Sequence, residues 1–246
     1  MICCFLIPIY NHHETITATV DKLLPFALPI IIVDDGSNQQ TKAALAAIVQ
    51  AHPDAVTLHT RDVNGGKGAA AMDGFRIAAN QQMTHALQID ADGQHNHHDI
   101  PRFLAAAKAE PEALISGLPQ YDDSMPLSRK IGRKITHFWV HIETLSLQIK
   151  DTMCGFRVYP LGPTLATMNT KQIGERMDFD IEIMVRMYWR RVPVRFIETP
   201  VIYPEGGRSH FRALEDNWLI SKMHTRLFFG MLLRSPVLIA RKLGLS

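Results

Sequence analysis

Two aspartates one residue apart, Asp90 and Asp92, give the sequence its clearest sign of chemistry. They stand at the end of an apolar run, and side chains at positions i and i+2 of a strand point to the same face. Two carboxylates at such a short distance repel each other unless a cation lies between them. Gln94 continues the spacing with a neutral carbonyl oxygen, and Mg²⁺ or Mn²⁺ prefers such oxygen ligands. The pattern predicts a metal site at Asp90, Asp92 and Gln94, and its ordinary alternative is a solvated turn before a helix.

Three other polar or glycine-rich turns follow apolar runs in the same way. They are Pro-Ile-Tyr-Asn at 8–11, Asp-Asp-Gly-Ser at 34–37 and Asn-Gly-Gly-Lys-Gly at 64–68. An acid at a strand end can accept a hydrogen bond from a ribose hydroxyl, and glycines before a helix present backbone N–H groups to an anion. The alternative for each is a capped strand-to-helix turn. Because neither Ser nor Thr follows Lys67, the third turn is not the phosphate loop of an ATPase.

The apolar runs themselves predict the elements that position these turns. Strands are expected at 2–9, 29–33, 55–60 and 84–90, and helices at 14–24, 40–50 and 67–82. The strand runs are continuous rather than alternating, as in a parallel sheet that is covered on both faces. The order predicts an α/β fold with a doubly wound sheet, which binds its ligands beyond the carboxyl ends of the strands. The four turns should therefore face one crevice.

The second half of the chain is less regular. A strand is expected at 113–118, a strand pair or one long strand at 194–203, and helices at 127–149, 180–191 and 213–233. With no repeat or low-complexity linker, the simplest division is one domain at 1–210 with a C-terminal helical extension at 211–246. On the predicted helix at 127–149, Arg129 and Arg133 are four residues apart and share a face that could hold a phosphate. A solvated basic stripe is the alternative.

Composition limits the class of protein. The chain is 46% hydrophobic and 20% charged, which is typical of a globular protein, and its net charge of +2 predicts no nucleic-acid partner. Cys3, Cys4 and Cys154 are expected to be reduced, buried thiols of a cytoplasmic protein. The sequence shows no signal peptide and no apolar stretch of about 18 residues that would cross a membrane.

Taken together, the motifs resemble glycosyltransferase family 2, which has the GT-A fold. Asp-Thr-Met-Cys-Gly-Phe-Arg at 151–157 and Phe-Asp-Ile-Glu at 179–182 resemble segments of the branch that transfers sugars to dolichyl or polyprenyl phosphate. The likeness covers about residues 2–210. It implies an inverting, metal-dependent transfer of a sugar from a UDP- or GDP-linked donor to a polyprenyl phosphate or another lipid.

The resemblance also implies roles for particular residues. The donor would be bound by Pro8, Tyr10, Asn11, Asp34, Asp35, Lys67 and Asp90, and the metal by Asp90, Asp92 and Gln94. Arg129 and Arg133 would meet the acceptor phosphate. Asp92, Asp180 and Arg208 would be catalytic, with Arg208 closing over the donor phosphates. In relatives that loop often contains Gly-x-Ser-Lys, whereas here 205–211 holds an arginine.

Several alternatives stay open on the sequence alone. A phosphate acceptor needs no strong base, whereas a hydroxyl on a lipid, pigment or glycan would need one, with Asp180 or Glu182 as the candidate. The helix at 213–233 mixes apolar and basic residues, so we expect it either at a membrane interface or packed on the core or a second subunit. More distant hypotheses are a nucleotidyltransferase and a non-catalytic binding module. The motifs specify neither the sugar nor the oligomeric state.

Overall fold

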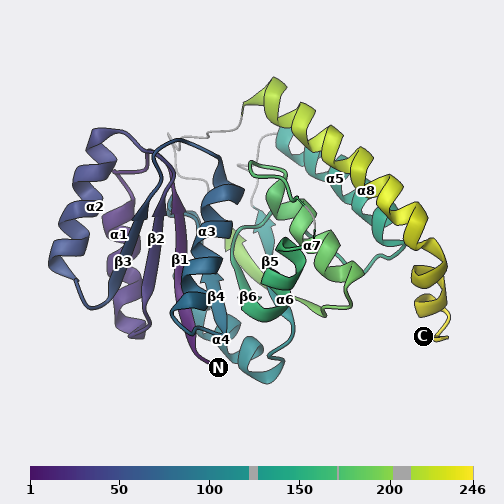
Figure 1. Cartoon of the computed structure of the whole chain (residues 1–246), viewed down its shortest axis with the longest axis horizontal. Coiled ribbons are helices and arrows are strands. Elements are labelled where there is room, and N and C mark those ends of the chain that lie inside the picture. Colours follow the sequence, from purple (N-terminus) through teal and green to yellow (C-terminus); the bar gives the residue numbers. More distant parts are fainter. Residues whose placement is uncertain (122–126, 171, 202–211, 246) are drawn as a thin grey trace.

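The computed structural model describes residues 1–121, 127–170, 172–201 and 212–245. Its centre is a seven-stranded sheet in the order β3-β2-β1-β4-β6-β5-β7. The first four strands, which are mutually parallel, are β1 (Cys3–Ile9), β2 (Ile30–Asp34), β3 (Val56–Thr60) and β4 (His85–Gln88). They are linked by α1 (Ile16–Leu23) with the short 3-10 helix η1 (Leu24–Phe26), by α2 (Gln39–Ala51) and by α3 (Lys67–Asn80). The predicted doubly wound half is confirmed (Figure 1).

The second half completes the sheet with one reversed strand. After η2 (His97–Asp99) and α4 (Ile100–Ala109) come β5 (Leu114–Tyr121), α5 (Leu127–Thr144), β6 (Arg157–Pro160), α6 (Leu161–Met168), α7 (Phe179–Trp189), β7 (Val194–Val201) and α8 (Ala213–Lys242). Strand β6 lies antiparallel between β4 and β5, and β7 is parallel to β5. The sheet is therefore mainly parallel, as expected, although neither β6 nor α6 was predicted.

Alternate side chains of each buried strand belong to two separate hydrophobic cores, one on each face of the sheet. On β1, Cys4 and Leu6 join the core that α3, α6, α7 and α8 cover, whereas Phe5 and Ile7 join the core that α1, α2 and α4 cover. This is the two-sided burial that makes the strand sequences continuously apolar. Cys3, Cys4 and Cys154 are free and buried, and burial raises the pKa of each thiol to about 12.

Two helix ends differ from the prediction. Helix α5 ends at Thr144 rather than at residue 149, because Leu145 adopts a left-handed φ of 49°. Helix α8 continues through Pro236 to Lys242, whereas it was expected to end near residue 233. Proline has no N–H for the carbonyl one turn earlier. Here the Ser235 hydroxyl donates to the Leu232 carbonyl at 2.8 Å and satisfies that acceptor instead.

Helix α8 packs on the rest of the molecule along its inner face. Met223, Leu227 and Met231 are buried in the same core as α3 and α7. The predicted boundary at 210/211 falls at the edge of residues 202–211, which lie outside the described residues, so the division into two parts stays a prediction. Among the described helices, none combines the length and the apolar character needed to traverse a bilayer.

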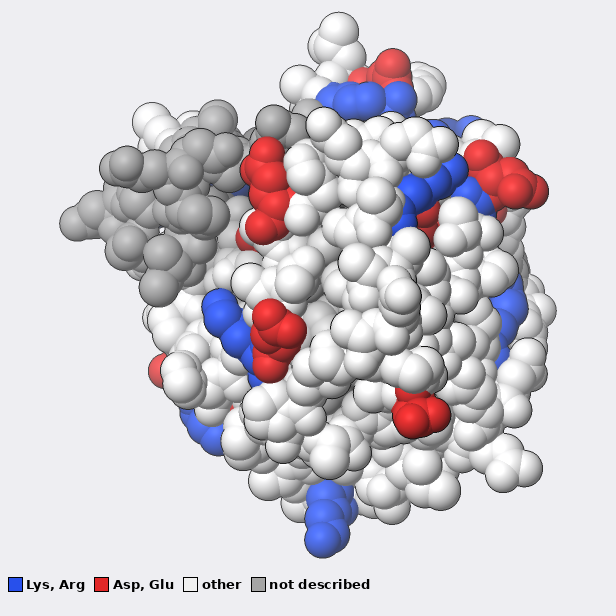
Figure 2. Space-filling view, turned by 90° about the vertical axis from the view of Figure 1, so that its left-hand side faces the viewer, with Lys and Arg blue, Asp and Glu red and all other residues white. Residues whose placement is uncertain are grey.

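Charged residues are spread thinly over the side of the molecule that carries α2. Figure 2 shows Lys and Arg interspersed with Asp and Glu on this face, separated by uncharged residues. Among the described residues, the basic side chains on this face form no continuous surface.

Candidate active site

The turns after β1, β2, β3 and β4 border one cavity of about 1600 Å³. Its lining includes seven of the predicted site residues at this edge of the sheet and two from α5: Pro8, Tyr10, Asp35, Lys67, Asp90, Asp92, Gln94, Arg129 and Arg133. The expected common crevice is present, because parallel strands bring their carboxyl ends to the same edge.

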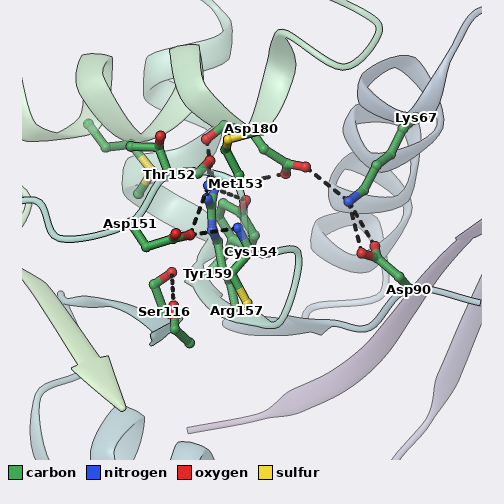
Figure 3. A network of polar contacts seen from close by, with 12 residues as sticks. Lys67, Asp90, Ser116, Asp151, Thr152, Met153, Cys154, Arg157, Tyr159 and Asp180 are labelled. Carbon is green, nitrogen blue, oxygen red and sulfur yellow. Dashed lines mark hydrogen bonds and ion pairs between the residues drawn. The ribbon is translucent and has the colours of Figure 1, made fainter. Parts of the chain in front are cut away.

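Lys67 joins two carboxylates at the floor of this cavity. Its ammonium nitrogen lies 2.8 Å from Oδ1 of Asp90 and 2.9 Å from Oδ2 of Asp180, and the three side chains converge in Figure 3. His95 Nε2 lies 3.3 Å from the other oxygen of Asp90. Burial acts to raise the pKa of Asp90, but the charge of Lys67 and the contact with His95 outweigh it and hold that pKa well below its usual range. Asp90 is thus a carboxylate at neutral pH.

Asp92 and Gln94 lie in a half-exposed turn at the cavity wall. Oδ1 of Asp92 accepts a hydrogen bond from the Gln94 N–H at 3.0 Å, and Gly93 between them adopts a left-handed φ of 73°. The described residues include no group of three His, Cys, Asp or Glu side chains that could hold a metal ion unaided. Mg²⁺ and Mn²⁺ are commonly held by one or two carboxylates together with substrate phosphates. The oxygen donors of Asp90, Asp92 and Gln94 fit an ion shared with a diphosphate in that way.

The segment 151–157, quoted from the sequence as a family motif, forms the wall behind the ion pair. A Cβ on Gly155 would stand 2.7 Å from the Lys67 ammonium nitrogen, so a larger residue there would have to displace the ends of the ion-paired side chains. Asp151 Oδ1 accepts from the N–H groups of Met153 at 2.9 Å and Cys154 at 2.8 Å, which fixes the turn (Figure 3). The motif thus serves the site through its backbone, a role that the site prediction had not assigned to it.

Arg157 anchors the same segment from beneath. Its guanidinium is fully buried and donates to the carbonyls of Thr152 at 2.7 Å and Asp180 at 2.8 Å and to the Tyr159 hydroxyl at 3.1 Å (Figure 3). These acceptors satisfy both terminal nitrogens of the buried guanidinium, whereas its Nε has no partner among the described residues. Arg157 therefore ties the turn at 151–157 to the start of α7, which carries Asp180.

Arg129 and Arg133 of α5 both line the cavity on the side away from β1. Arg133 forms an ion pair with Asp151 and lies 4.8 Å from the centre of the Tyr121 ring. His137 Nε2 lies 3.4 Å from the same Asp151 carboxylate. This arrangement holds Arg133 in place and uses part of its charge within the protein.

The predicted donor-binding residues divide into two groups. Pro8, Tyr10, Asp35, Lys67 and Asp90 line the cavity. The Asp35 carboxylate accepts from the N–H groups of Gly65 at 2.9 Å and Gly66 at 2.7 Å, so it also shapes the glycine-rich turn. Burial raises the pKa of Asp35, and these hydrogen bonds offset that rise only in part.

Asn11 and Asp34 are not among the lining residues of the cavity. Asp34 is fully buried and accepts from the Ser37 N–H at 3.0 Å. Asn11, with a left-handed φ of 58°, accepts on Oδ1 from the Asn38 N–H at 2.8 Å. In the structure both side chains build the turns after β1 and β2, so their predicted contact with the donor stays a prediction without a cavity contact behind it.

The three remaining predictions concern acids and a loop arginine. Asp180 lies behind Lys67 and is 7% exposed, and it does not line the cavity. Glu182 is fully buried between Arg186 and Arg226. The ion pair with Arg186, four residues later on α7, gives Glu182 a structural role. Arg208 lies outside the described residues.

The fold and the site define a GT-A glycosyltransferase, and comparison with known proteins gives the family. Residues 4–171 match Glycosyl transferase family 2, and the chain belongs to that family. It is 26% identical to a dolichyl-phosphate beta-glucosyltransferase of Dictyostelium discoideum, over 93% of this chain and 74% of that protein. An undecaprenyl-phosphate mannosyltransferase of Micrococcus luteus is 27% identical, over 81% of this chain and 82% of that protein. These relatives belong to the branch that the sequence motifs resemble.

Solved structures show the same fold. Glucosyl-3-phosphoglycerate synthase from Mycobacterium tuberculosis, in complex with Mn²⁺, UDP-glucose and glycerol 3-phosphate, aligns with a TM-score of 0.66 at 15% identity over 93% of this chain and 79% of that one. A mannosyltransferase from Pyrobaculum calidifontis, in complex with GDP-Man and Mn²⁺, aligns with a TM-score of 0.62 at 16% identity over 98% of this chain and 68% of that one.

Proposed function

We propose that this enzyme transfers a sugar, with inversion, from a UDP- or GDP-linked donor to a polyprenyl phosphate in the presence of Mg²⁺ or Mn²⁺. One observation carries the proposal: a single cavity joins the acidic turn at Asp90 and Asp92 to the basic face at Arg129 and Arg133. Donor diphosphate and acceptor phosphate can thus be held next to each other. The names of the lipid-phosphate relatives support the acceptor, and the complex with Mn²⁺ and UDP-glucose supports the donor and the metal.

On the donor side, Pro8, Tyr10 and Asp35 would border the nucleotide. Asp90, Asp92 and Gln94 would hold the metal, which when bound neutralises charge on the departing nucleoside diphosphate. Lys67 keeps Asp90 ionised through the ion pair between them. Arg208, outside the described residues, is proposed to add positive charge to the same leaving group.

On the acceptor side, the disposition of the acids favours a phosphate. Asp180 is engaged by Lys67, and Glu182 is engaged by two arginines. Neither is available as a free carboxylate at the cavity wall, whereas a hydroxyl acceptor needs a base in hydrogen-bond reach. A phosphate acceptor is anionic near neutral pH and needs only to be held in line, a task that fits Arg129 and Arg133. Transfer to a hydroxyl is the alternative.

We also propose that helices α5 and α8 contact a membrane surface. Ile135 and Phe138 on α5 and Trp218, Phe229 and Leu233 on α8 are exposed. Lys130 and Lys134 stand beside the apolar row of α5, a combination that suits an anionic lipid surface on the cytoplasmic side. Phe229→Ser should weaken sedimentation with phosphatidylglycerol vesicles, and equal sedimentation of both proteins would remove this part of the proposal.

The decisive experiment measures sugar transfer with a panel of UDP- and GDP-sugars and polyprenyl phosphate, with Mn²⁺ or Mg²⁺ titrated after chelation. Lipid products are identified by mass spectrometry. Transfer should require the metal and should be abolished by Asp92→Ala, whereas Asp54→Ala, at an exposed aspartate outside the cavity, should leave it unchanged. Transfer at the wild-type rate by Asp92→Ala would refute the metal site. Absence of transfer with every donor would refute the function.

A further inference from the structure

The cavity continues into a groove between α5 and α8, which lie side by side along the molecule (Figure 1). We call this part the α5–α8 groove, lined by Thr136 and Trp139 from α5 and by Ile220, His224 and Phe228 from α8. The Trp139 ring centre lies 6.2 Å from that of Phe228 and 6.3 Å from that of His224. The groove is therefore aromatic around His224, with polar side chains of α8 (Asp216, Asn217, Ser221 and Thr225) also in the lining, and Arg129 and Arg133 border the same cavity.

A buried acid–histidine pair forms part of this groove. Glu143 of α5 is fully buried, and its Oε1 lies 2.7 Å from Nδ1 of His224, which is 7% exposed. Burial raises the pKa of Glu143, and the hydrogen bond to His224 partly counters that rise. The contact fixes the orientation of the imidazole, because one ring nitrogen is committed to Glu143.

The other ring nitrogen is not satisfied. Nε2 of His224 is buried and has no hydrogen-bond partner among the described residues, and the same holds for Oε2 of Glu143. Buried polar atoms in folded proteins are almost always hydrogen-bonded, so each exception calls for an explanation. A purely structural pair that ties α5 to α8 would explain the bond at Nδ1 but not the free Nε2 on a residue that lines the groove.

We propose that His224 is a binding residue for the sugar acceptor, and that its Nε2 makes a hydrogen bond to an oxygen of the acceptor held in the α5–α8 groove. The inference rests on the proposed function and adds a residue to its acceptor site. Glu143 acts as the positioning residue, since it holds the imidazole through Nδ1. A hydrocarbon chain alone would leave Nε2 unsatisfied, whereas a phosphate or hydroxyl oxygen completes it.

The two sources of that oxygen make different demands on the imidazole. A phosphate oxygen only accepts, so Nε2 must carry a proton, and the neighbouring Glu143 carboxylate then balances the imidazolium charge. A hydroxyl can donate to a bare Nε2 of the neutral ring, whose Nδ1–H donates to Glu143. Farnesyl phosphate and farnesol have the same chain and differ in this head group, so they separate the two cases.

The test is a binding titration of the full chain with farnesyl phosphate and with farnesol, followed through the imidazole NMR signal of His224. The signal is assigned by its loss in His224→Gln. Acceptor should shift this signal, and His224→Leu should weaken binding about tenfold or more, with His224→Gln between the two. The KM for acceptor should rise while the KM for donor stays constant. His59→Leu, at an exposed histidine on β3, is the matched control.

Glu143→Gln is a second test of the assignment, and it remains informative if the leucine variant does not fold. The glutamine still offers Nδ1 a hydrogen-bond acceptor but carries no negative charge. If the imidazolium is the binding form, this variant should therefore weaken the binding of farnesyl phosphate more than the binding of farnesol. Equal acceptor affinity in wild type, His224→Leu and His224→Gln with an unmoved His224 signal would overturn the inference while transfer continued. Absence of sugar transfer by the wild type would instead refute the proposed function, and the inference with it.

Discussion

Gly155 and Asp90 lie in direct contact at the cavity floor: a Cβ on Gly155 would come within 2.4 Å of Oδ2 of Asp90. The backbone of the 151–157 segment therefore sets how far the Asp90 carboxylate can turn. A side chain of any size at position 155 must displace Asp90, Lys67 or the segment itself.

Gly155→Ala is expected to lower kcat/KM by about 100-fold, since a displacement of about 1 Å at a catalytic group can have that effect. Steady-state transfer assays measure it. Gly162→Ala on α6 is the matched control, because a Cβ there meets nothing within 4 Å. That control should be neutral or slightly stabilising, as expected for alanine in a helix. Equal activity of both variants would show that the tight contact is unimportant.

Lys67→Met leaves two adjacent carboxylates, Asp90 and Asp180, without their shared cation. Removal of one partner from a buried ion pair costs about 3 kcal/mol, so urea unfolding should show a loss of this order. The double variant Lys67→Met with Asp180→Asn should recover part of the loss, because one of the repelling charges is gone. Strictly additive effects of the two substitutions would contradict the bridge.

The Asp151 carboxylate gives a pH prediction. Burial acts to raise its pKa, but His137 and Arg133 outweigh burial and hold the pKa below its usual range in the folded protein. The unfolded chain then binds more protons, so this contribution to stability is complete at neutral pH and is lost as pH falls below about 4. Asp151→Asn should be less stable at pH 7 and should lose less stability between pH 7 and pH 3. Parallel stability–pH curves would refute the assignment.

Glu182→Gln separates a structural acid from a catalytic base. Because Glu182 is fully buried between Arg186 and Arg226, the variant should lose about 3 kcal/mol of stability, while kcat per folded molecule stays near the wild-type value. Glu110→Gln breaks an exposed ion pair with Arg195 and should cost less than about 1 kcal/mol. A large fall in kcat of folded Glu182→Gln would return Glu182 to the list of possible bases.

Much of the N-terminal half could be predicted from sequence, because β1, β2 and β4 are buried along their whole length and each strand is followed by a polar turn. Asp90, Asp92, Gln94 and Lys67 line the same cavity, since parallel strands bring consecutive turns to one edge. The pairing of Lys67 with Asp180 was not predicted, because it depends on how α7 packs against α3. No local pattern at Asp180 encodes that distance.

The C-terminal half was harder to predict. Strand β6 has four residues and starts with the fully buried Arg157, so it lacks the apolar run that marks a strand. Helix α8 passes through Pro236, a residue that usually ends a helix, because the preceding serine supplies the missing donor. His224 was not singled out, since a histidine among apolar helix residues gives no sign of its partner Glu143 on another helix.

The three inaccessible sulfur atoms have a practical consequence. With pKa values near 12, Cys3, Cys4 and Cys154 hold almost no reactive anion at neutral pH, so maleimides should pass over the native chain. A single replacement at the exposed Lys222 by cysteine would then receive a spin label or dye selectively. The label would report whether α8 approaches a bilayer when vesicles are added, which is the membrane contact proposed above.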